Sequence, residues 1–160
     1  MEDKYHNWLK LILKEFAVEN SNKLKRHNSS IKLTSTKRHS KSIIEYEPDY
    51  CFSFKTGKKS FEYIVLEFLD SQDDEGIFAD IIECACIKNC RMLIFLAKDA
   101  EKSDRAFIIS DIVSNLLDEL NEETYLEVVT LHIPMNMNKE EVKKEIFNQI
   151  KRQLKLVNSS

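Results

Sequence analysis

The chain has 160 residues, of which 42% are hydrophobic and 32% charged, and only two glycines and two prolines. This length and apolar content predict one packed domain, residues 1–160, and argue against a disordered chain. The net charge of −3 favours no class of partner, and no apolar run reaches the ~20 residues that a membrane-spanning helix needs. The first residues lack the pattern of a signal peptide, so we expect a soluble, cytoplasmic protein with no membrane partner.

An amphipathic helix is predicted at the start of the chain. Apolar residues recur at every third or fourth position from Tyr5 to Phe16, which is the spacing of one helix face. Glu15 and Glu19 lie one turn apart at the edge of this face.

A basic stretch without any acid follows, from residue 21 to residue 44. Its seven cations are Lys23, Lys25, Arg26, Lys32, Lys37, Arg38 and Lys41. Hydroxyl, amide and histidine side chains stand between them, and cations and hydroxyls are the groups that contact nucleic-acid phosphates. We therefore expect DNA contact here, while a solvated connection whose charges serve only solubility remains the alternative. A short strand is expected at Ile31 and Leu33.

Strands and helices then alternate. Strands are expected at 42–46, at 50–54 and, after a turn at 55–59, at 61–69. A helix beginning at residues 73–75 presents Ile77, Phe78, Ile81, Ile82 and Ala85, and a fully apolar strand follows at 92–97. A helix over 104–120 presents Ile109, Ile112, Val113, Leu116, Leu117 and Leu120. A strand at 125–133 precedes a last helix from Asn138, with a stripe of Val142, Ile146, Ile150, Leu154 and Val157.

This order of elements predicts the α/β class, a single domain with a mixed central sheet flanked by helices on both faces. Strands joined through helices should run parallel, with right-handed crossovers. Three of the four cysteines, Cys84, Cys86 and Cys90, fall within seven residues, and the fourth is Cys51. Because their segment reads as helix, where residues two apart point to different sides, we expect buried free thiols rather than a zinc site.

Two acids occur where an acid is unusual. Asp49 follows Pro48 at the start of one expected strand, and Glu67 lies inside the apolar run of the next. A carboxylate in a buried strand is costly unless it is paired, hydrogen-bonded or bound to a cation. Two acids that converge at a sheet edge are suitable ligands for Mg²⁺ or Mn²⁺. The alternative is that Glu67 faces solvent and Asp49 is a turn residue.

The pattern Pro48-Asp49 followed by Glu67-Phe68-Leu69 resembles the PD-(D/E)XK motif of the restriction-endonuclease-like nucleases. The resemblance covers residues 3 to 97 and implies a core of helix, hairpin or meander of strands, helix and strand, followed here by a C-terminal helix, strand and helix. It also implies that Asp49 and Glu67 bind the divalent metal, that Glu15 assists them, and that the protein is a metal-dependent DNA endonuclease.

The motif is incomplete at one position. The lysine of the family would stand two residues after the acid, on the same face of the strand, where this chain has Leu69. Lys88 is the best substitute, because it follows Ile77, Ile81 and Ala85 at helical spacing. The alternative for Lys88 is a snorkelling residue near a helix end. If nothing replaces the lysine, the protein is an inactive relative that binds DNA or a protein. The sequence does not fix the oligomeric state, and it allows a homodimer.

Overall fold

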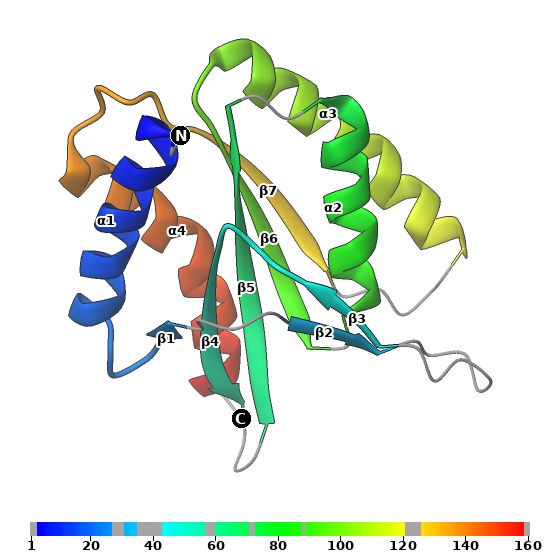
Figure 1. Ribbon diagram of the computed structural model, residues 1–160. Helices are drawn as coiled ribbons and strands as arrows, with labels where there is room; N and C mark the ends of the chain where they lie inside the picture. The colour runs from blue at the N-terminus through cyan, green and yellow to red at the C-terminus, as the bar shows by residue number, and fades with distance from the viewer. Residues whose placement is uncertain are drawn as a thin grey trace.

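A mixed β-sheet separates two layers of helices (Figure 1). The computed structural model describes residues 3–26, 31–34, 43–56, 60–70, 73–87, 89–120 and 126–158. In these residues the helices are α1 (Lys4–Glu19), α2 (Asp74–Cys86), α3 (Ala100–Leu120) and α4 (Lys139–Asn158). The strands are β1 (Lys25–Arg26), β2 (Ile31–Thr34), β3 (Ile43–Tyr46), β4 (Tyr50–Thr56), β5 (Ser60–Leu69), β6 (Cys90–Ala97) and β7 (Glu127–His132).

The main sheet has the strand order β1-β4-β5-β6-β7. The pairs β1/β4 and β4/β5 are antiparallel, whereas β5/β6 and β6/β7 are parallel and are connected through α2 and α3. Strands β2 and β3 form a separate antiparallel pair. The α/β class, the mixed sheet and the parallel pairing of helix-connected strands are therefore confirmed. No described helix is both long and apolar enough to cross a membrane.

Each face of the sheet has its own apolar core. On one face, alternate residues of β5 such as Leu66 and Phe68 pack with the buried residues of α1 and α4. On the other face, Val65 and Leu69 pack with buried residues of α2 and α3. Strand β6 lies inside the sheet, between β5 and β7, and its residues from Met92 to Ala97 are all fully buried. A β5 side chain therefore belongs to the α1/α4 layer or the α2/α3 layer according to the parity of its number.

The first helix is anchored by a buried tyrosine. The Oη atom of Tyr5 donates a hydrogen bond to the carbonyl oxygen of Ile133 at 2.7 Å, and both residues are fully buried. We expect Tyr5→Phe to lower the free energy of unfolding by about 1–2 kcal/mol, because that carbonyl loses its buried donor. Urea denaturation followed by circular dichroism measures the effect. An unchanged midpoint would show that the hydrogen bond contributes nothing to stability.

Two expected buried faces need correction. Phe78 of α2 is 46% exposed, and Ile112 and Leu116 of α3 are 54% and 47% exposed. Helix α3 instead packs through Ala106 and Val113, which are both buried. The six apolar positions assigned to α3 span more of its circumference than the sheet can cover, so one side of that set faces solvent. Of the four free cysteines, only Cys86 is exposed, which corrects the expectation that all four are buried.

Candidate functional site

The pairing of β4 with β5 brings Asp49 and Glu67 together. Tyr50 pairs with Leu66, so the residue before Tyr50 comes opposite Glu67. The Oδ2 atom of Asp49 accepts a hydrogen bond from the backbone N–H of Phe68 at 2.8 Å. Pro48 has no N–H to extend the ladder, so β4 starts only after the bend. Asp49 is thus held at the sheet beside the acid of the neighbouring strand.

Glu67 is buried, with 6% of its surface exposed. It shares the parity of Val65 and Leu69, and therefore faces the layer of α2 and α3. The Oη atom of Tyr46, the last residue of β3, donates a hydrogen bond to Oε1 of Glu67. A third acid, the buried Asp80 of α2, is close enough for its charge to act on Glu67. We call Asp49, Glu67 and Asp80 the carboxyl cluster.

The carboxyl cluster holds a proton at neutral pH. Burial, followed by the negative charges of Asp49 and Asp80, raises the pKa of Glu67 to about 10. A hydrogen bond to Asp49 contributes in the same direction, while the hydrogen bond from Tyr46 opposes it. The phenol of Tyr46 also has a raised pKa, first because it is buried and then because Cys84 and Glu67 lie nearby. Tyr46 is therefore a neutral donor, and Glu67 is a neutral acid.

The donor atoms of this cluster suit a hard divalent cation. Mg²⁺ is typically bound through one or two carboxylates with water completing its octahedron. Asp49 is half-buried, so solvent reaches the pair from its side. The positive charge of an ion would offset the burial and the repulsion between carboxylates, which together keep Glu67 protonated. Asp49 and Glu67 would hold such an ion.

A second set of ligand atoms lies on the opposite face of the sheet. Within the described ranges, only Asp3, His6 and Asp70 bring three ligand atoms within 4.8 Å of one another. Nε2 of His6 lies 3.1 Å from Oδ1 of Asp70, and the His6 ring meets the ring of Phe68 edge-on. Asp3 caps α1 by accepting from the N–H of Tyr5. Sequence reasoning missed this set because Asp70 is 64 residues away from His6 in the chain and the three residues form no motif.

Glu15 lies away from the carboxyl cluster. It is on α1, which covers the other face of the sheet, and its carboxylate is 3.4 Å from Nζ of Lys139 and 3.2 Å from Nζ of Lys143. The hydrogen bond from Lys143 is the main reason why the pKa of Glu15 is lowered. In this structure Glu15 therefore joins α1 to α4, and Asp80 is the acid that approaches Glu67.

The position of the motif lysine is apolar. Leu69 is fully buried among residues of α2, including Ile77 and Ile81. Lys88, the suggested substitute, lies outside the described residues. Its neighbour Asn89 accepts a hydrogen bond from the N–H of Tyr63, four residues before Glu67.

Part of the basic stretch lies close to the carboxyl cluster. Lys23 and Lys25 are exposed, and Arg26 and Lys32 belong to β1 and β2. Strand β2 pairs with β3 so that Ile31 stands opposite Tyr46, the residue that binds Glu67. Figure 1 shows this strand pair beside α2. The other three cations, Lys37, Arg38 and Lys41, lie outside the described residues.

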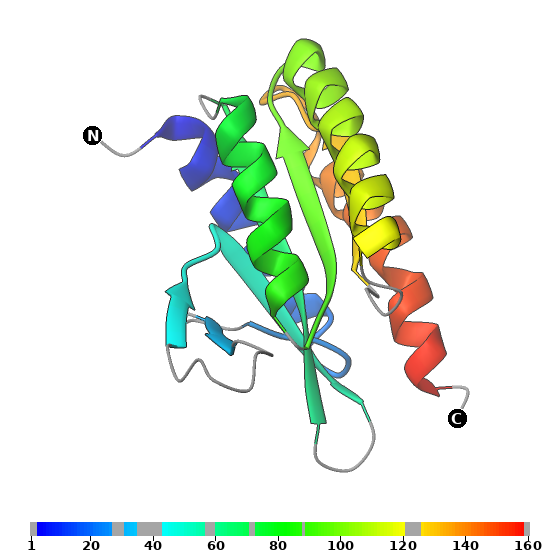
Figure 2. The ribbon, with the colours of Figure 1, turned by 90° about the vertical axis from the view of Figure 1, so that its right-hand side faces the viewer.

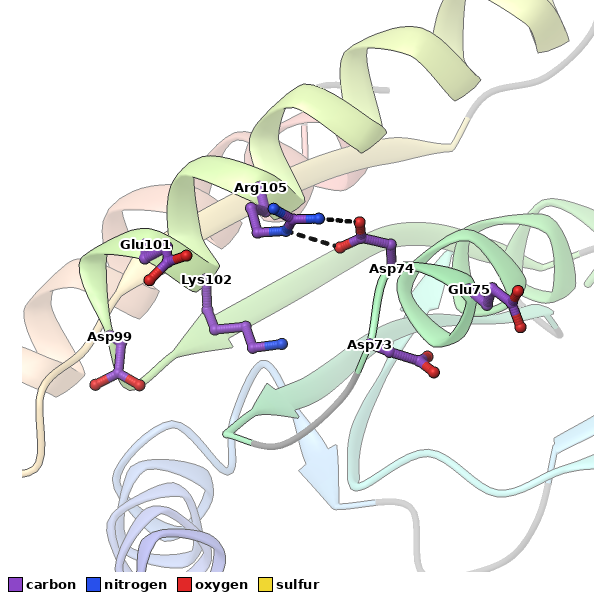
Figure 3. Close-up of a pocket in the computed structure, with 7 residues that line it drawn as sticks. All are labelled: Asp73, Asp74, Glu75, Asp99, Glu101, Lys102 and Arg105. Atoms are coloured by element: carbon purple, nitrogen blue, oxygen red, sulfur yellow. Dashed lines mark hydrogen bonds and ion pairs between the residues drawn. The ribbon is translucent and has the colours of Figure 1, made fainter.

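A depression of about 600 Å³ opens between the first turns of α2 and α3. Figure 3 shows its lining, which consists of Asp73, Asp74, Glu75, Asp99, Glu101, Lys102 and Arg105. Arg105 donates through Nε and Nη2 to the two carboxylate oxygens of Asp74, and so connects the two helices. None of these residues belongs to the carboxyl cluster. Comparison with family models, with curated proteins and with solved structures gives no match.

Proposed function

We propose that the protein is a metal-dependent hydrolase of nucleic-acid phosphodiester bonds, an endonuclease-like enzyme whose metal ligands are Asp49 and Glu67. The observation that carries this proposal is the buried, protonated carboxyl of Glu67 beside a second carboxyl on the neighbouring strand. An apolar residue would fill the same place in the core without that cost. A site in which Mg²⁺ or Mn²⁺ replaces the proton of Glu67 would explain why an acid occupies this buried position.

The strand order is compatible with the resemblance to the restriction-endonuclease-like nucleases. Helix α1 precedes three antiparallel neighbours, β1, β4 and β5, and α2 then leads to β6, which is parallel to β5. Asp49 stands immediately before β4, the middle strand of these three, and Glu67 stands within β5. The resemblance expects its two metal ligands on neighbouring strands of this kind, which supports the proposal.

Each group of residues would have its own role in the hydrolysis. A divalent ion, when bound, would supply an activated water molecule and would neutralise charge on the phosphate. Asp49 and Glu67 would hold that ion, and Tyr46 would fix the rotamer of Glu67 through its hydrogen bond. Cations of the basic stretch bind the phosphates of the DNA backbone. A lysine such as Lys88 would have to supply the charge that Leu69 lacks.

A second candidate function is favoured by one specific observation. Leu69 is fully buried in an apolar core, so no cation occupies the position of the motif lysine. A chain that lost this lysine and kept its fold would bind DNA, or a protein partner, without cleaving. Cleavage assays distinguish the two functions, because both predict binding and only the first predicts strand breaks.

The test is cleavage of supercoiled and linear DNA in Mg²⁺ or Mn²⁺. We expect wild-type protein to cut, and both Glu67→Ala and Asp49→Asn to abolish cutting. Glu47→Ala is the matched control, because Glu47 is an exposed acid two residues from Asp49 and should retain full activity. Lys88→Ala should remove cutting and leave DNA binding intact. Binding without any cutting would support the second candidate, and cutting by Glu67→Ala would refute the metal site itself.

The basic stretch makes a separate prediction about binding. If most of its seven cations contact phosphates, raising the salt concentration from about 50 to about 200 mM should weaken DNA binding by about three orders of magnitude. Replacing both Lys23 and Lys25 by alanine should reduce the slope of log K against log salt by about 2. The control replaces Lys10 and Lys14, two exposed lysines of α1, and should leave the slope unchanged. Fluorescence anisotropy with a labelled duplex measures both, and a flat salt response would leave the stretch as a solvated connection.

A further inference from the structure

Two lysines that are far apart in the sequence meet at one edge of the main sheet. Strand β1 pairs with β4 so that Lys25 stands opposite Ser53, and Lys55 comes two residues further along β4. Diagonal neighbours of this kind lie about 7–8 Å apart and point to the same face of the sheet. Both lysines are exposed. The sequence from residue 50 to residue 61 contains no acid, so the positive charge of this edge is not offset by neighbours in the chain.

An exposed aromatic residue completes this surface. The register of β4 and β5 places Phe61 directly opposite Lys55, on the same face of the sheet as both lysines. Phe61 is 42% exposed. Figure 2 shows the ends of β4 and β5 extending past the end of α2, so that helix does not cover this end of the hairpin. We call Lys25, Lys55 and Phe61 the basic–aromatic patch.

The charge of the basic–aromatic patch is not balanced within the described part of the chain. Glu62, the acid that follows Phe61 on β5, points to the opposite face and accepts a hydrogen bond from Nε of Arg91 at 2.6 Å. No ion pair between described residues includes Lys25 or Lys55. Like charges on neighbouring strands repel one another, so a polyanion is the ligand that would stabilise this arrangement.

We propose that the basic–aromatic patch binds single-stranded DNA, with Lys25 and Lys55 on phosphates and one base stacked on the ring of Phe61. Cations combined with exposed aromatic rings are the features by which proteins bind unpaired strands, because every base has a π-face that can stack. In a duplex these faces are covered by the neighbouring base pairs, so a duplex can use only the lysines. The aromatic ring therefore gives the patch a preference for an unpaired strand.

The patch and the carboxyl cluster lie on the same face of the sheet. Phe61 and Glu67 are both on β5 and six residues apart, so their side chains point the same way and are separated by about 20 Å along the strand. One DNA strand can extend over both, and the substrate would then carry an unpaired segment beside the position of cleavage. This step from ligand to substrate rests on the proposed hydrolase function, whereas binding at the patch does not.

Fluorescence anisotropy without metal tests the proposal, with labelled oligothymidine used alone and as a duplex with oligoadenine. We expect wild-type protein to bind the single strand about tenfold more tightly than the duplex, and Phe61→Ala to remove this preference without changing duplex binding. Lys55→Ala should weaken binding of both and reduce the slope of log K against log salt by about 0.7 for the single strand. Phe107→Ala is the matched control, because Phe107 is an exposed phenylalanine of α3 and its substitution should leave binding unchanged.

A spectroscopic measurement tests the stacking itself. Phe61→Trp should keep the preference for the single strand, and its indole fluorescence should fall when oligothymidine is added, because a stacked base quenches the indole. Wild-type protein is the control: its single tryptophan, Trp8, packs in the α1/α4 layer on the other face of the sheet, and its fluorescence should not change.

Three results would overturn the proposal. They are equal binding of the single strand and the duplex by wild-type protein, a single-strand affinity that Phe61→Ala leaves unchanged, and unquenched fluorescence in Phe61→Trp. Circular dichroism of each variant separates the loss of binding from the loss of the fold. Cutting of DNA by a protein that fails these tests would support the hydrolase and refute the patch, whereas passing them without any cutting would support the patch and refute the hydrolase.

Discussion

The free energy of unfolding should fall as the pH rises from about 5 to about 9, and Glu67→Gln should remove most of that fall. The folded protein keeps the Glu67 proton up to a pKa of about 10, whereas an unfolded glutamate loses it near 4.5. Between these values the folded state binds one more proton than the unfolded state, so each rise in pH favours unfolding. The slope for one proton is at most about 1.4 kcal/mol per pH unit.

Glutamine is a suitable replacement because it mimics the neutral acid. Its carbonyl oxygen can accept from Tyr46, and its amide can donate to Asp49. Near neutral pH the variant should therefore be more stable than wild type, by up to about 3 kcal/mol. Denaturation series in urea at several pH values, with Glu47→Gln as the control, measure the difference. A wild-type curve parallel to that of Glu67→Gln would contradict a raised pKa for Glu67.

Binding of Mn²⁺ should release close to one proton per ion and should tighten up to about tenfold for each rise of one pH unit between about 6 and 9. The reason is that an ion at Asp49 and Glu67 must displace the Glu67 proton, which the apo protein holds until a pKa of about 10. Titration calorimetry in buffers with different ionisation enthalpies counts the protons released. Asp49→Asn should lower the affinity, and Glu67→Gln should abolish both the binding and its pH dependence.

The control for this experiment is the second set of ligand atoms. His6→Ala should leave the affinity unchanged if the ion occupies the carboxyl cluster. Loss of binding in His6→Ala, with normal binding in Glu67→Gln, would instead place the ion at Asp3, His6 and Asp70, on the other face of the sheet. It would also remove the main support for the hydrolase.

The elements of the fold could be predicted because their patterns are strong. The stripe of α1 and the apolar run of β6 have one interpretation each, and both are found as expected. The partial burial of α3 could not be predicted, because its apolar residues exceed what one packing face can cover. Only the tertiary structure shows that Ala106, a small residue, marks the buried side.

The candidate site was only partly predictable. The register of a hairpin is local, so the neighbourhood of Asp49 and Glu67 follows from the turn between their strands. The approach of Asp80 and Tyr46 depends on how α2 and β3 pack, and no spacing in the sequence encodes that contact. Glu15 was assigned because the resemblance implies an acid on the first helix. Its partners on α4, Lys139 and Lys143, are more than 120 residues away in the chain.

The packing of α1 against α4 has a consequence for synthesis of the chain. The buried face of α1, with Leu9 and Phe16, completes its core with Val142 and Ile146 of α4. A ribosome adds about 5–20 residues per second, so α4 is synthesised on the order of ten seconds after α1. During that time its apolar face has only the sheet to cover it, and part of the core stays open to water. The protein is therefore expected to acquire its stable form only once α4 has been synthesised and can pack, rather than progressively from its N-terminus.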